Sequence, residues 1–388
     1  MTPDLFARST VRGLVASQIR EVANAGMGEP DILAFWFGEP DEVTPEYIRD
    51  AAVASIAAGE TFYTQNLGLP ELRAAIAGYV TRQHRPATEG NVAVTSSGMS
   101  ALMLVVEALV GPGDRVVCVT PLWPNLTEIP KILGADVVRV GLQFREEGWT
   151  LDLQSLLDAL KPGTRAVMIN SPNNPTGWAL TRAEQEAILA HCRRHGIWVI
   201  TDDVYERLYY AGGSAPSFLD LADAADRVVS TNSFSKAWLM TGWRLGWILA
   251  PPALMPDLAK LIEYNTSCAP AFVQRAGVVA ITEGEPTVRH TLERFRAARD
   301  FLVARLSALD GIEAASPPGA MYVFFRVDGV EDSLDFCKRL VREARLGLAP
   351  GSAFGPEGEG FVRWCFAASP ERLTEGVRRL AHHLNRYR

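Results

Sequence analysis

Short apolar runs alternate with longer amphipathic stretches along the chain, up to about residue 255. Short apolar runs bounded by turn formers are typical of strands buried on both faces of a sheet, and the longer stretches repeat their apolar residues at helical spacing. We therefore expect strands at residues 32–37, 92–95, 115–120, 135–140, 166–169, 197–200, 227–231 and 245–249. We expect helices at residues 9–25, 45–58, 70–83, 99–110, 153–160 and 183–195. Strands that alternate with helices predict an α/β fold with a mostly parallel, doubly wound sheet.

The pattern changes after Pro256, where a long helical region leads to about Leu309. The remaining segments predict strands at residues 322–327 and 361–366 and helices at residues 334–345 and 370–387. This order is typical of a smaller α+β domain, and we expect the N-terminal helix to join it. The predicted division is a large domain at residues 37–285 and a small domain made of residues 1–36 and 286–388.

Composition narrows the class of protein. A chain of 388 residues, 48% of them hydrophobic, is long enough for a large core and more than one domain. Its formal net charge of −7 and the lack of a basic patch argue against a nucleic-acid partner. Its apolar runs are shorter than a bilayer span, and the N-terminus lacks the apolar core of a signal peptide, so we expect no membrane segment. Scattered cysteines and histidines without ligand spacing favour reduced thiols, a cytoplasmic location and no metal site.

The candidate chemistry begins with Ser233-Phe234-Ser235-Lys236, which follows an expected strand, and with Arg244 shortly after it. A lysine at the end of a buried strand loses hydration, which disfavours its ammonium form and makes its amine a usable nucleophile. Hydroxyl side chains and an arginine fork suit a phosphate group. The stretch therefore indicates a Schiff base to a phosphorylated aldehyde cofactor. Taken alone, it also fits a surface lysine beside a salt-bridging arginine.

Other polar or small residues follow further expected strands, at Gly38, Gly98, Trp123, Asn174 and Asp202. Ligands of parallel α/β sheets bind beyond the carboxyl ends of the strands, so these residues are expected to lie near Lys236. Each signal is weak alone. The turn before Gly98 could be an ordinary connection between a strand and a helix, and Trp123 could be a packed core residue.

Several motifs occur in a fixed order: Asn170-Ser171-Pro172-Asn173-Asn174-Pro175-Thr176-Gly177, then the Ser-Phe-Ser-Lys box, then Thr241-Gly242-Trp243-Arg244, then Pro318-Gly319-Ala320-Met321-Tyr322. With these motifs the chain resembles the fold-type-I pyridoxal-phosphate enzymes. Specifically, it resembles the class I/II aminotransferases, in the branch of bacterial aspartate and aromatic aminotransferases. The resemblance extends from Phe37 to Arg363 and covers nearly the whole chain.

The resemblance implies a role for each matching residue. Lys236 is expected to be the Schiff-base lysine, which also moves a proton between the substrate Cα and the cofactor. Asp202 is expected to pair with the pyridinium nitrogen. Tyr205 and Asn174 would hydrogen-bond the phenolic oxygen of the cofactor, and Trp123 would stack on its ring. Asp203, next to Asp202, is expected to be structural.

The resemblance also implies contacts for the phosphate and the substrate. The expected phosphate contacts are Gly98, Met99, Ser233, Ser235 and Arg244, with Tyr63 reaching the phosphate of a neighbouring subunit in a homodimer. Arg363 would bind the substrate α-carboxylate beside the Gly38 backbone, with Trp123 and Asn174 completing the substrate site. One position departs from the family pattern: many relatives carry Thr or Lys where this chain has Met99, which offers only its backbone N–H.

The expected reaction is transfer of an amino group from an amino acid to a 2-oxo acid, with 2-oxoglutarate as the expected acceptor, in two half-reactions. A C–S β-lyase on the same fold is the alternative, because a fold does not fix a reaction. An effector domain of a transcription regulator is a weaker alternative. Such a regulator would need a DNA-binding segment before the fold, and the expected fold begins almost at the first residue. The residues Trp36, Phe37, Trp123 and Trp238 could form an apolar pocket, which favours aromatic or aliphatic substrates over aspartate.

Overall fold

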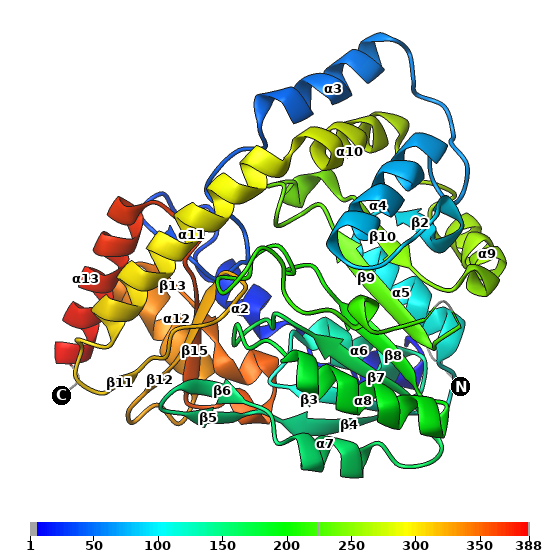
Figure 1. Ribbon diagram of the computed structural model, residues 1–388. Coiled ribbons are helices and arrows are strands. Elements are labelled where there is room, and N and C mark those ends of the chain that lie inside the picture. Colours follow the sequence, from blue (N-terminus) through cyan, green and yellow to red (C-terminus); the bar gives the residue numbers. More distant parts are fainter. Residues whose placement is uncertain (1–5, 224, 387–388) are drawn as a thin grey trace, which may run out of the picture.

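A seven-stranded sheet forms the centre of the molecule in the computed structural model, which describes residues 6–223 and 225–386 (Figure 1). In spatial order its strands are β2 (Val92–Thr95), β10 (Gly246–Leu249), β9 (Val228–Ser233), β8 (Trp198–Asp202), β7 (Thr164–Asn170), β3 (Arg115–Thr120) and β4 (Asp136–Gly141). Strand β10 runs antiparallel to both of its neighbours, and the other paired strands are parallel. The prediction of a mostly parallel α/β sheet is confirmed.

Helices cover both faces of this sheet. They are α4 (Pro70–Gln83), α5 (Gly98–Leu109), α6 (Pro124–Ile132), α7 (Leu153–Ala159), α8 (Arg182–His195), α9 (Met255–Asn265) and α10 (Ala271–Glu283). Helix α3 (Glu46–Ala57) packs against α10 (Figure 1). Successive strand residues point to opposite faces, so Val117 of β3 belongs to one buried apolar cluster and Cys118 to another. Burial on both faces explains why the strands are continuous apolar runs in the sequence.

A second, four-stranded sheet lies beside the first (Figure 1). It pairs β11 (Ile312–Glu313), β12 (Tyr322–Val327), β15 (Phe361–Cys365) and β14 (Ala349–Pro350) in antiparallel order. The elements α2 (Gln18–Asn24), α11 (Glu285–Leu306), α12 (Ser333–Arg339) and α13 (Pro370–Arg386) contribute to the same part of the molecule. Tyr387, the expected end of the last helix, lies outside the described residues, as do residues 1–5 of the expected small domain.

Several elements differ from the expectation. The expected helix at residues 9–25 is split into α1 (Ser9–Arg12) and α2, because the chain turns at Gly13 and the Ser17 side chain caps α2 by accepting from Arg20 N at 3.2 Å. The expected strand at residues 32–37 is reduced to β1 (Leu33–Ala34), which pairs with β13 (Leu346–Gly347). A π-helical turn at Leu340–Ala344 follows α12. Helix α6 and the hairpin of β5 (Gln143–Arg145) and β6 (Gly148–Thr150) were not expected.

The long helical region after Pro256 is three helices, α9, α10 and α11. Ser267, with a positive φ of 60°, separates the first two, and Gly284 lies between the last two. Within the described ranges, no helix has the length and apolar character needed to cross a bilayer.

Candidate active site

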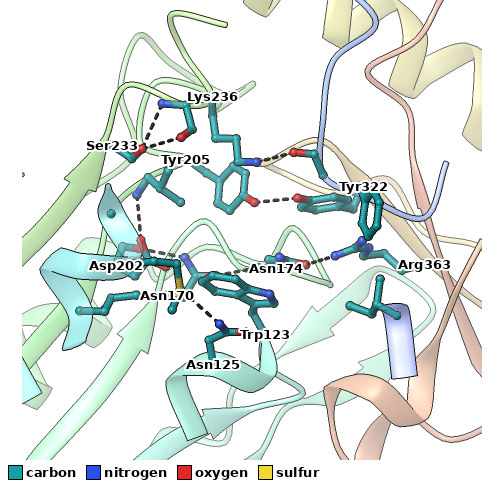
Figure 2. Close-up of a pocket in the computed structure, with 18 of the residues that line it drawn as sticks. Trp123, Asn125, Asn170, Asn174, Asp202, Tyr205, Ser233, Lys236, Tyr322 and Arg363 are labelled. Carbon is teal, nitrogen blue, oxygen red and sulfur yellow. Dashed lines mark hydrogen bonds between the residues drawn. The ribbon is translucent and has the colours of Figure 1, made fainter. Parts of the chain in front are cut away.

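A cavity of about 470 Å³ opens at the carboxyl edge of the large sheet. It is lined by most of the residues expected to form the site: Gly38, Gly98, Met99, Trp123, Asn174, Asp202, Tyr205, Ser233, Ser235, Lys236, Arg244 and Arg363. Figure 2 shows that the labelled members of this set converge from several strand ends on one space. Tyr63 is the exception. It is 89% exposed and lies in a separate surface depression, so it does not reach the cavity of its own chain.

Lys236 follows β9 and extends into the cavity, where its Nζ donates a hydrogen bond to the Gly38 carbonyl oxygen (Figure 2). Burial disfavours the ammonium form and lowers the pKa of this lysine to about 8. The neutral amine, which is the nucleophilic form, is therefore a much larger fraction near neutral pH than in an ordinary lysine, although the ammonium form still predominates.

Asp202 ends β8 and is 7% exposed. Burial, and then the neighbouring carboxylate of Asp203, raise the pKa of Asp202 to about 7. Within the described structure, the hydrogen bond found for its carboxylate is a long one, from Val204 N at 3.4 Å. A buried carboxylate with so little support favours a cationic partner, which would also lower its pKa. A protonated ring nitrogen is such a partner. Asp203, expected to be structural, thus also acts on Asp202 electrostatically.

Arg363 lies on β15 and is 2% exposed. Its Nη1 donates to Asn174 Oδ1 at 2.8 Å, and its Nη2 donates to the Trp36 carbonyl oxygen. The guanidinium carbon lies 4.4 Å from the centre of the Tyr322 ring. Its Nε has no hydrogen-bond partner among the described residues. A buried, fixed guanidinium with a free donor is suited to a carboxylate ligand.

Tyr205 and Tyr322 share a hydrogen bond of 2.7 Å between their hydroxyl groups (Figure 2). Burial raises the pKa of Tyr205 well above 10 and that of Tyr322 to about 12, so both remain neutral hydroxyls. Gly38 packs against this pair, because a Cβ atom on Gly38 would overlap the Tyr322 hydroxyl. The glycine therefore allows the backbone to approach the cavity closely.

The other end of the cavity combines the start of α5 with the loop between β9 and β10. Ser97 caps α5 by accepting from Ser100 N at 3.1 Å. The Ser233 and Ser235 hydroxyls lie 2.8 Å apart, and Arg244 has a left-handed backbone with φ of 54°. Helix-start N–H groups, two hydroxyls and an arginine fit a phosphate group. The Met99 side chain does not take part in this group of donors, since its Sδ accepts a hydrogen bond from Asn125 Nδ2 at 3.3 Å.

The structure also brings in lining residues that had no expected role: Ser17, Ile19, Arg20, Leu102, Asn125, Asn170, Val204 and Tyr322. Phe37, expected in an apolar pocket, lines the cavity as well. Asn170 accepts from Asn174 N at 2.7 Å and donates to the Asp202 carbonyl oxygen at 2.9 Å. Asn170 and Tyr322 stand inside recognised motifs, which was a signal for both. Arg20 had no such signal, because it is one exposed arginine on an amphipathic helix.

Comparison with known proteins gives a consistent result. Residues 30–380 match the family described as aminotransferase class I and II. The chain is 34% identical to the aspartate aminotransferase of Pyrococcus horikoshii, with 97% of this chain and 96% of the relative covered. It is 36% identical to the aspartate aminotransferase of Thermotoga maritima, with 92% of each covered. The solved aspartate aminotransferase from Rhizobium meliloti has a TM-score of 0.91 at 32% identity, covering 98% of this chain and 99% of that one.

The chain belongs to the class I and II aminotransferase family. It is a pyridoxal-phosphate-dependent transaminase, which moves an amino group between an amino acid and a 2-oxo acid. The expected family, fold, enzyme class and cofactor are thereby confirmed. The residues of the cavity fit this cofactor, because one space combines a lysine amine of lowered pKa, a buried carboxylate with one long hydrogen bond, and groups suited to an anion.

Proposed function

We propose that this transaminase works by two half-reactions at Lys236, with 2-oxoglutarate as the amino acceptor. The observation that carries the proposal is that Lys236 and Asp202 line the same cavity. The pKa of Lys236 is lowered, and the buried Asp202 carboxylate has only a long hydrogen bond from Val204 N among the described residues. When bound, pyridoxal phosphate supplies an aldehyde that accepts the amino group and a ring that withdraws electrons from the substrate Cα. The protein must then hold the ring, bind the substrate and move one proton.

Lys236 has the role of proton carrier in this proposal. Its amine would hold the cofactor aldehyde at rest and later take a proton from the substrate Cα, which requires the neutral form favoured by burial. Asp202 would keep the ring nitrogen protonated, and Tyr205 with Asn174 would donate hydrogen bonds to the phenolic oxygen. Trp123 would stack on the ring. Gly98, Met99, Ser233, Ser235 and Arg244 would hold the phosphate.

Arg363 would bind the α-carboxylate that every substrate of such an enzyme carries. Support comes from its unpartnered Nε and from the fixed geometry that Asn174 and Trp36 give it. Because Asn174 uses its oxygen to hold Arg363, its amide nitrogen stays available as a donor. Gly38 would contribute backbone contacts on the same side of the substrate.

We further propose a homodimer in which Tyr63 reaches the phosphate of the neighbouring subunit. Its 89% exposure, close to the 83% of Phe62, supports this, since large exposed aromatic side chains mark contact surfaces. Sedimentation at low micromolar concentration should give twice the chain mass, and Tyr63→Ala should weaken cofactor retention. A monomer that retains the cofactor would contradict this part of the proposal.

The cellular location and the domain division are also proposals. Five free cysteines support a reducing, cytoplasmic location. The division into residues 37–285 and residues 1–36 with 286–388 draws support from core packing, because Ile19 and Val22 share an apolar cluster with Phe295 and Phe325.

The test of the function is spectroscopic and chemical. The purified protein should show a visible absorbance band from its cofactor that an amino acid bleaches, and Lys236→Ala should abolish both the band and turnover. A panel of amino donors with 2-oxoglutarate should yield glutamate. Release of pyruvate and ammonia from cysteine or cystathionine without any acceptor would instead indicate a C–S β-lyase.

A further inference from the structure

The side chains lining the cavity carry more positive than negative charge. The cations are Arg20, Lys236, Arg244 and Arg363, and the carboxylate is Asp202. In the proposed function Lys236 holds the aldehyde, Arg244 the phosphate and Arg363 the α-carboxylate. Arg20 is the lining cation left without a role, and a substrate with a second carboxylate would supply the matching charge.

Arg20 is held in place at the mouth of the cavity. Its guanidinium carbon lies 4.6 Å from the centre of the Phe37 ring, and Phe37 directly precedes Gly38, whose carbonyl contacts Lys236. Ile19, the preceding residue, is 7% exposed and anchors α2 in the core. The helix that carries Arg20 and the turn that carries Phe37 are thus fixed relative to the reactive lysine.

The guanidinium of Arg20 is available for a ligand. Within residues 6–223 and 225–386, neither the salt bridges nor the side-chain hydrogen bonds found include its guanidinium nitrogens. Stacking on an aromatic ring uses the flat face of a guanidinium and leaves the N–H groups at its edge free to bind a carboxylate bidentately. Arginine is also more weakly hydrated than lysine, which lowers the cost of such a contact.

The apolar pocket expected from the sequence is only partly formed. Phe37 and Trp123 line the cavity, but Trp36 is 4% exposed and Trp238 3% exposed, and neither lines it. Trp36 packs edge-on against Phe37 from outside, and Trp238 packs in the core against Phe234. The side chain of a substrate would therefore meet Arg20 and Phe37 rather than a wall of indole rings.

We propose that Arg20 binds the distal carboxylate of dicarboxylic substrates, both amino acids and 2-oxo acids, and so determines specificity. This proposal rests on the proposed function, because it needs Arg363 at the α-carboxylate to set the direction of the substrate. Met99, uncharged and bonded to Asn125, offers no cation that could substitute for Arg20. Arg20 touches the substrate away from the reacting atoms, so it acts on substrate choice and leaves the chemistry of the amine to Lys236.

The first experiment compares Arg20→Ala, Arg20→Lys and a control, Arg305→Ala, in the holoenzyme. Arg305 is also exposed and stacked on an aromatic ring, Phe301 at 5.4 Å, but lies outside the cavity. With a common amino donor, Arg20→Ala should lower kcat/KM for 2-oxoglutarate by roughly 10- to 100-fold and that for pyruvate by no more than about 3-fold. Arg20→Lys should recover part of the loss, and Arg305→Ala should match the wild type. Equal losses for the two acceptors would overturn the proposal.

The second experiment measures binding without turnover. Calorimetry should show that succinate binds the wild-type holoenzyme more tightly than butyrate and that Arg20→Ala removes this difference. A persisting difference would overturn the role of Arg20. A wild type that turns over neither 2-oxoglutarate nor pyruvate would contradict the proposed function instead, and the succinate comparison would still decide the role of Arg20. Unchanged melting temperatures would show that the variants are folded.

Discussion

Nη1 of Arg363 donates a hydrogen bond of 2.8 Å to Oδ1 of Asn174, which lies 189 residues earlier in the chain. The bond joins the antiparallel sheet to the loop after β7, and it orients both side chains toward the cavity (Figure 2). Together with the bond from Nη2 to the Trp36 carbonyl oxygen, this contact fixes the orientation of the guanidinium, and it leaves the amide nitrogen of Asn174 free to donate.

Replacing Arg363 by lysine keeps the charge but removes the planar donor fork. We expect kcat/KM for every amino acid to fall by roughly 10- to 100-fold, because a hydrogen bond to the α-carboxylate and the bond to Asn174 are both lost. Arg326→Lys is the matched control, since Arg326 also stacks on an aromatic ring, Phe361 at 5.0 Å, but lies outside the cavity. A loss confined to one class of amino acid would contradict binding at the α-carboxylate.

The pKa of Lys236 predicts how cofactor loading depends on pH. Burial lowers this pKa to about 8, so the fraction of neutral amine increases as the pH rises through that value. The rate at which cofactor-free protein takes up pyridoxal phosphate should therefore rise to a plateau with a midpoint near pH 8. Stopped-flow absorbance measures this rate, and N-acetyl-lysine methyl amide serves as the unperturbed reference. A midpoint near that of the reference would disprove the lowered pKa.

His84 predicts a pH dependence of stability. Its side chain is 2% exposed and lies between Glu206 at 3.0 Å and Asp220 at 2.8 Å. Burial disfavours the charged ring, but the hydrogen bonds to Asp220 and Glu206 outweigh it and raise the pKa of His84 from 6.5 to about 10. A group whose pKa is higher in the folded state stabilises most at low pH, so this contribution is complete below about pH 6.5 and lost as the pH rises through 10.

His84→Gln should therefore destabilise the protein by roughly 3 kcal/mol near pH 6, because one partner of a buried ion pair is removed. The difference in melting temperature between the variant and the wild type should shrink as the pH is raised toward 10. His290→Gln, at an exposed position, is the control. A difference that stays constant over this range would contradict a charged His84.

Gly246 on β10 packs against the start of α5, which is part of the expected phosphate site, so a larger residue there should disturb both. A Cβ atom there would lie 2.5 Å from Gly98 N and 2.6 Å from the Ser97 carbonyl carbon, both backbone atoms at the start of α5. Gly246→Ala should cost about 2 kcal/mol of stability through overpacking and should also weaken cofactor binding. Gly242→Ala is the control, because a Cβ at Gly242 has no neighbour within 4 Å. Calorimetric melting and cofactor titration measure both effects, and equal behaviour of the two variants would contradict this expectation.

The central sheet could be predicted closely from the sequence. Strands β2 and β3 begin and end at the expected residues, because each is an apolar run with a polar or small residue at its end. The residues that follow strands of the large sheet, such as Trp123, Asn174, Asp202 and Lys236, were also expected near one another, since the carboxyl ends of parallel strands share one edge. The sequence pattern did not predict two local features. Gly13 and Ser17 divide an amphipathic stretch that has the pattern of a single helix. The short strands β5 and β6, joined by a charged turn, have too few residues to show a strand pattern.

The substrate end of the site was harder to predict for a different reason. An apolar residue near a motif can point toward the cavity or into the core, and the sequence does not distinguish the two. Trp36 and Trp238 point into packed clusters, whereas Phe37 faces the cavity with Arg20 stacked on it. The contact between Arg20 and Phe37 joins two segments whose relative position depends on the packing of α2, which is a tertiary feature.

The reversed strand β10 has a consequence for the order in which the site forms. Gly246 pairs with Ser233 across β9 and β10, so Lys236 and Arg244 belong to one short antiparallel unit. The contacts of Lys236 with Gly38 and of Arg363 with Asn174 join residues 198 and 189 positions apart. Contacts local in sequence cost less chain entropy and form earlier. Pulse-labelled hydrogen exchange should protect residues 233–246 before β15, and simultaneous protection would contradict this order. A newly made chain would then fix the spacing between Lys236 and Arg244 before it can distinguish one amino acid from another.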